Sequence, residues 1–73
     1  MELPSIIEVI NMQKYVGCTM DIIYQDRNGR LTQRRIRVQS VHGHTIRAYD
    51  FGKRSPRVFR LENILAVELV RSA

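Results

Sequence analysis

The sequence predicts a mainly β domain, a small five-stranded barrel preceded by an N-terminal α-helix. Beyond residue 16, apolar and polar residues alternate in several short segments, which is the pattern of strands with one buried face. Turn-forming pairs such as Asn28-Gly29 separate these segments. With 73 residues, 44% of them hydrophobic, we expect one domain over residues 1–73 with a modest core, complete as a small gene product.

The segment over residues 5–15 predicts the helix. Ser5 followed by Glu8 has the form of a capping box, and Gly17 can end the element. Helical spacing continues through the apolar residues Leu3, Ile6, Ile7 and Ile10. Because several of these side chains are β-branched, a strand over the same residues stays an open alternative.

Residues 16–70 predict five strands. The first places alternate residues on one face, namely Val16, Cys18, Met20, Ile22 and Tyr24. A turn at 26–29 leads to a second strand that buries Ile36 and Val38, and a phase break at Val41 indicates a bulge.

His42-Gly43 predicts the next turn. In the third strand Ile46 and Ala48 face one way, whereas Arg47, Tyr49 and Phe51 face the other, with Phe51 expected in the core. A loop over 52–56, a strand over 57–61 and a last strand to about residue 70 follow. One helix and five short, bent strands are typical of a Sm/SH3-like barrel.

Positive charge is concentrated in one part of the chain. Residues 27–60 carry ten basic residues, nine of them Arg, and one acid, whereas the rest carries two basic residues and six acids. Arginine binds phosphate through a planar fork and stacks on bases, so this distribution is typical of a nucleic-acid binder. An acidic protein partner is the alternative.

Candidate site residues lie within this basic segment. We expect Arg35, Arg37, Arg47 and Arg57 to contact phosphate and Tyr49 to stack on a base, although Tyr49 could equally cover the sheet. The loop residues Lys53 and Arg54 would add attraction without specificity. Arg60 either joins the site or pairs with an acid such as Glu62. Four phosphate contacts to a single strand predict a salt slope of about −3.

Short motifs resemble the C-terminal half of a WYL domain, over about residues 22–67. They are Ala48-Tyr49-Asp50, the run from Arg57 to Ile64 (RVFRLENI), Tyr24 to Gly29 (YQDRNG), and Arg34 to Val38 (RRIRV). The resemblance implies a Sm-like barrel that binds nucleic acid or nucleotide-type ligands, is regulatory, and has a ligand surface including Arg57 and Arg60.

This sequence also departs from the WYL pattern. His44-Thr45-Ile46 stands where the family has Trp-Tyr-Leu, the expected Pro after the basic strand is missing, and no helix-turn-helix fits in the chain. The resemblance therefore implies a short, stand-alone variant that lacks the Trp-Tyr-Leu signature. The layout of elements is also similar to that of bacterial Sm-like RNA chaperones, which form rings through edge strands.

The expected function is a cytoplasmic, bacterial binding module for nucleic acid, with single strands favoured, or for a nucleotide-type ligand. A lone Cys18 fits a reducing compartment, and no signal peptide or membrane span is expected. We expect no enzyme and no cofactor, because the sequence has no paired carboxylates placed for acid–base work, no Gly-rich phosphate loop and no nucleophile elbow. We expect no metal, since His42 and His44 have no further ligand nearby. The alternative is a protein-interaction or homo-oligomerisation module that uses an edge strand over 64–70.

Overall fold

The computed structural model describes residues 12–70. This part of the chain contains five strands and two short 3-10 turns. In chain order the elements are η1 (Met12–Tyr15), β1 (Thr19–Gln25), β2 (Leu31–His42), β3 (Thr45–Asp50), β4 (Ser55–Arg60), η2 (Leu61–Asn63) and β5 (Ile64–Leu69).

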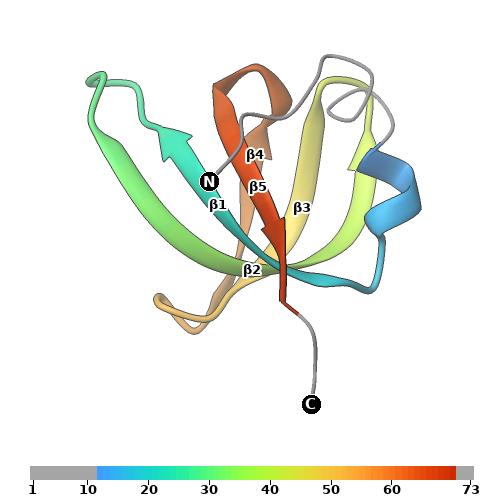
Figure 1. The fold of residues 1–73 in the computed structure, drawn as a ribbon. Coiled ribbons are helices and arrows are strands. Elements are labelled where there is room, and N and C mark those ends of the chain that lie inside the picture. The colour runs from blue at the N-terminus through green and yellow to red at the C-terminus, as the bar shows by residue number, and fades with distance from the viewer. Residues whose placement is uncertain (1–11, 71–73) are drawn as a thin grey trace.

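The five strands form one antiparallel sheet in the order β4-β3-β2-β1-β5 (Figure 1). The 12-residue β2 is the central strand and sweeps across the whole molecule in Figure 1. The pairing of β2 with β3 shifts register between Val38 and Ser40, and the pairing of β1 with β5 shifts between Ile23 and Tyr24. Such irregularities bend a sheet, and the first confirms the bulge predicted near Val41.

The prediction of a closed barrel is wrong. Within residues 12–70, β4 pairs only with β3 and β5 only with β1, so both are edge strands and the sheet is open. The three residues of η2 carry the chain from one edge strand to the other. The ends of β4 and β5 therefore lie near each other, while their backbones form no ladder.

The turn between β1 and β2 forms as its residues predict. One carboxylate oxygen of Asp26 accepts the backbone N–H groups of Asn28 and Arg30, each at 2.9 Å. Gly29 has a φ of +79°, a left-handed conformation that glycine adopts without steric cost. This turn fixes the register of the two longest strands.

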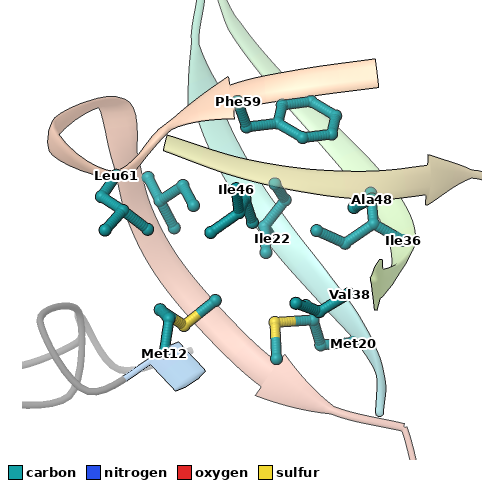
Figure 2. Close-up of a cluster of buried hydrophobic side chains, with 10 residues drawn as sticks. Met12, Met20, Ile22, Ile36, Val38, Ile46, Ala48, Phe59 and Leu61 are labelled. Carbon is teal, nitrogen blue, oxygen red and sulfur yellow. The ribbon is translucent and has the colours of Figure 1, made fainter. Parts of the chain in front are cut away.

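The core consists of the side chains that point into the curve of the sheet. Fully buried members include Ile22 of β1, Ile36 of β2 and Ile46 of β3, as the alternation predicts. Figure 2 shows Met12 and Met20 at one end of this cluster and Phe59 at the other. The Met12 side chain anchors η1 to this core, because it is only 1% exposed.

The predicted N-terminal α-helix is wrong in the part that the structure describes. Met12–Tyr15 forms a single 3-10 turn, and Gly17 follows it with a φ of +89°. The rest of the predicted helix, residues 5–11, lies outside the described residues. No helix within residues 12–70 has the length and apolar character to cross a bilayer.

Candidate nucleic-acid interface

The predicted site residues divide between two faces of the sheet. Arg47 of β3 pairs with Val58 of β4, whereas its buried neighbour Ala48 pairs with Arg57. Paired residues project from the same face. Arg57 therefore lies on the interior side of the sheet, and Arg47 lies on the outer side. The structure does not bring these two arginines together on one strand face.

The outer face carries a cluster of one cation and two aromatic rings. The rings of Tyr49 and Phe51 meet edge to face, with their centroids 5.2 Å apart. The guanidinium carbon of Arg37 lies 5.8 Å from the Phe51 centroid, within cation–π range. Phe51 is 39% exposed, so its expected place in the core is wrong. Phe51 continues the alternation of Arg47 and Tyr49 and so projects from the outer face, whereas Ala48 and Asp50 project into the core.

Arg35 lies on the same outer face but is held by an acid. Its Nε donates to Asp21 Oδ1 at 2.8 Å and its Nη2 to Asp21 Oδ2 at 3.1 Å. The hydrogen bond from Arg35 lowers the pKa of Asp21 despite some desolvation, and Asp21 in turn raises the pKa of Arg35. Asp21 also pairs across the sheet with Glu68. This half of the outer face is therefore acidic, and Arg35 is poorly placed to receive a phosphate.

A cleft of about 860 Å³ opens at the end of the sheet where the β1–β2 turn, β4 and η2 meet. Its lining includes four arginines, one from the β1–β2 turn, one from β2 and two from β4, together with polar and aromatic side chains. They are Tyr24, Asp26, Arg27, Asn28, Arg34, Thr45, Arg57, Val58, Phe59, Arg60 and Asn63. The predicted residues Arg57 and Arg60 both line this cleft, but from opposite faces of β4, since Arg57 pairs with Ala48 and Arg60 pairs with Thr45. We call this set the arginine cleft.

Two aromatic rings form the inner wall of the arginine cleft. Tyr24 and Phe59 meet edge to face with centroids 5.0 Å apart, and Phe59 is 2% exposed. The Tyr24 hydroxyl accepts the backbone N–H of Arg60 at 3.0 Å. That hydrogen bond ties β1 to the last residue of β4. The wall is therefore fixed by packing and by a tertiary hydrogen bond.

Arg34 and Asp50 form an ion pair beneath the cleft. Arg34 Nη1 lies 2.8 Å from Asp50 Oδ2, and the two side chains are 16% and 2% exposed. Asp50 Oδ1 also accepts the backbone N–H groups of Gly52 at 2.9 Å and Lys53 at 3.2 Å. Burial acts to raise the pKa of Asp50, but the hydrogen bonds from Arg34 and the loop outweigh it and leave the pKa below its ordinary value.

The guanidinium of Arg34 therefore stabilises the fold through its ion pair with Asp50. It also lies over the Phe59 ring, with its carbon 5.8 Å from the centroid. We assign Arg34 a positioning role in the cleft wall, because its charge is already matched by Asp50. The unmatched positive charge of the cleft therefore comes from the exposed arginines.

Three exposed arginines supply that charge. Arg27 lies in the β1–β2 turn, while Arg57 and Arg60 lie in β4. Within residues 12–70, Arg27 and Arg57 form no ion pair, and Arg60 has only a 3.9 Å contact between its Nη1 and Glu62 Oε1, both side chains being about 70% exposed. An exposed contact of this length contributes little. The field in the cleft is therefore positive.

The acid in the cleft offsets part of this positive charge without cancelling it. Asp26 accepts two backbone N–H groups of its own turn and keeps its negative charge, against three exposed arginines. Arg27 and Tyr24 line the cleft but were not among the predicted site residues. The turn motif YQDRNG was the available signal, since it holds both residues at one end of a hairpin.

The remaining candidates lie outside the cleft lining. Lys53 and Arg54 are exposed in the loop between β3 and β4, where Arg54 has a φ of +54°. His42 and His44 are exposed beside the β2–β3 turn. In the described part of the chain, no three His, Cys, Asp or Glu side chains gather as metal ligands would.

Comparison with known families finds no family model that matches this chain, and comparison with curated proteins finds no match. The resemblance to WYL domains accordingly stays a prediction.

Proposed function

We propose that this domain binds a nucleotide-type ligand, with single-stranded nucleic acid favoured, in the arginine cleft. The observation that carries the proposal is the convergence of Arg27, Arg57 and Arg60 around a fixed aromatic wall. Three guanidinium groups from two elements provide several phosphate contacts at once, each bidentate in principle. A concave site of this volume lies within the usual range for ligand pockets.

The polar residues of the cleft add the means to recognise a base. Asn28 in the turn and Asn63 in η2 line the cleft with the arginines and carry both donors and acceptors. Tyr24 adds an aromatic side chain to the same lining.

The test is fluorescence anisotropy of a labelled tetranucleotide, oligothymidylate or oligouridylate, across a salt series. Three phosphate contacts to a single strand predict that log K falls with log salt with a slope of about −2. The variants Arg57→Ala and Arg60→Ala should each weaken binding and make the slope shallower by about 0.7.

Lys14→Ala is the matched control, because it removes one exposed positive charge on η1, which packs at the other end of the core from Phe59. It should leave the slope unchanged. If neither oligonucleotide binds at low salt, or if the control weakens binding as much as the cleft variants do, the cleft is not the site.

We propose as a second candidate a homo-oligomerisation module, favoured by the position of β5. This strand lies at the sheet edge, as the alternative prediction requires, and its Leu69 is 48% exposed. Unpaired edge groups can add a strand from another chain. Light scattering during gel filtration tests this candidate: a dimer or larger species that Leu69→Lys converts to a monomer would support it.

A further inference from the structure

We infer that the ligand of the arginine cleft is a single strand that continues over the edge strand β4 onto the outer face of β3. The inference rests on the proposed function and specifies its ligand class. A lone nucleotide would occupy the cleft alone, whereas a longer strand would use a second contact surface. We call that surface, made of Arg37, Arg47, Tyr49 and Phe51, the outer platform.

The first observation is that β4 separates the two basic surfaces by the width of one strand. Val58 lines the cleft and is also the direct partner of Arg47 on the outer side. Val58 is 64% exposed, and within residues 12–70 no other strand covers the free edge of β4. Neighbouring strands lie about 5 Å apart. A ligand leaving the cleft at Arg57 therefore reaches Arg47 by crossing a single exposed strand.

The second observation is that the outer platform has the chemistry of a stacking site. Tyr49 and Phe51 present aromatic surface, and Arg37 lies against the Phe51 ring. Within residues 12–70, neither Arg37 nor Arg47 forms an ion pair, in contrast to Arg35. Stacked bases with arginines beside them are the usual means of binding single strands without sequence preference.

The third observation concerns direction. Acids of β1 and β5, Asp21 and Glu68, pair beside Arg35 on the far half of the outer face. They would repel a polyanion that continued across the sheet. The favourable path thus runs from the cleft over β4 and along β3, from Arg47 towards Phe51, which spans about 14 Å at the usual rise of a strand.

Chain length is the variable that tests this path. We expect a dodecanucleotide of thymidylate or uridylate to bind more tightly than the tetranucleotide, and its salt slope to steepen from about −2 to about −3.5 as Arg37 and Arg47 join three cleft arginines. The gain should level off within the range of about 4–16 nucleotides that small β domains cover.

Variants of the outer platform separate its role from that of the cleft. Tyr49→Ala should weaken dodecanucleotide binding about 5-fold or more and leave tetranucleotide binding unchanged. Tyr49→Phe, which keeps the ring, should bind the dodecanucleotide as the parent does. Arg47→Ala should reduce the slope of the dodecanucleotide alone by about 0.7.

The outcomes distinguish the inference from the proposed function. Equal affinity for both lengths, with cleft variants weakening each, would overturn the path over β4 and leave the cleft as the site. Tighter binding of the dodecanucleotide that is insensitive to Tyr49→Ala and Arg47→Ala would also overturn it. No binding of either probe would overturn the proposed function, and the inference with it.

Discussion

Replacing Asp50 with asparagine should destabilise the domain by about 2–4 kcal/mol. Asparagine keeps one oxygen for the N–H groups of Gly52 and Lys53 but turns an amide towards Arg34, where a carboxylate accepted a 2.8 Å bond. A hydrogen bond to a charged group contributes about 1.5–3 kcal/mol. Leaving the Arg34 guanidinium, with its side chain 16% exposed, without a counter-charge adds to that cost.

The loss is large relative to the whole domain. At the usual 0.05–0.15 kcal/mol per residue, a chain of 73 residues has a free energy of unfolding of about 4–11 kcal/mol. Urea unfolding followed by circular dichroism is the assay. With a slope of about 1 kcal/mol per molar urea for so small a protein, the midpoint should fall by about 2 M or more.

Asp21→Asn is the control for this experiment, because it makes the same chemical change in an ion pair whose arginine is 54% exposed. Exposed pairs contribute little to stability, so its midpoint should stay close to that of the parent. The reasoning is refuted if the two variants unfold at the same urea concentration. A double-mutant cycle with Arg34→Met should give a coupling of about 1 kcal/mol or more between Arg34 and Asp50.

Three further predictions concern stability. The pKa values of Asp21 and Asp50 lie below the ordinary 3.8, so in acid the folded state binds fewer protons than the unfolded chain. The urea midpoint should therefore fall as the pH drops below about 4. This decline should be weaker in the double variant Asp21→Asn with Asp50→Asn. Ile36→Ala should cost about 2–5 kcal/mol in the same assay, whereas Leu31→Ala, at a position 58% exposed, should cost under about 0.5 kcal/mol. Gly29→Ala, at a φ of +79°, should lower the thermal midpoint more than Gly29→Asn, since asparagine tolerates left-handed backbone better; equal shifts would contradict the strain argument.

Local pattern was enough to predict five strands and most of their positions. The loop predicted over 52–56 ends at Arg54, because Ser55 and Pro56 already pair with β3, and β4 ends at Arg60 rather than at residue 61. Alternation placed Ile36 and Val38, and Ile46 and Ala48, on the buried face, because a half-buried sheet requires period two. The Asn-Gly turn and the bulge in β2 also follow from short-range chemistry. Barrel closure is different, since it depends on how far the sheet curls, and no short segment determines that.

The division of the arginines between two faces depends on register between strands. Arg57 shares its parity with the buried Phe59, which was visible in the sequence, but its position opposite Ala48 depends on the conformation of the loop between β3 and β4. The Arg34–Asp50 pair had a clearer signal. Each residue alternates with the buried residues of its own strand and so projects to the interior. Two opposite charges that project to the interior from neighbouring strands predict an ion pair.

The exposed edge of β4 has a consequence for the solubility of the protein. An unprotected edge strand with apolar side chains is a template for aggregation, and proteins blunt such edges with proline and charge. β4 carries Pro56, Arg57 and Arg60 around the exposed Val58. If the proposed function holds, the cations that bind the ligand would also disfavour pairing of this edge with another copy of the chain. Removing these charges would weaken the proposed ligand binding and favour self-association through the edge of β4. A bound polyanion would neutralise the same guanidinium groups, but it would also cover the edge.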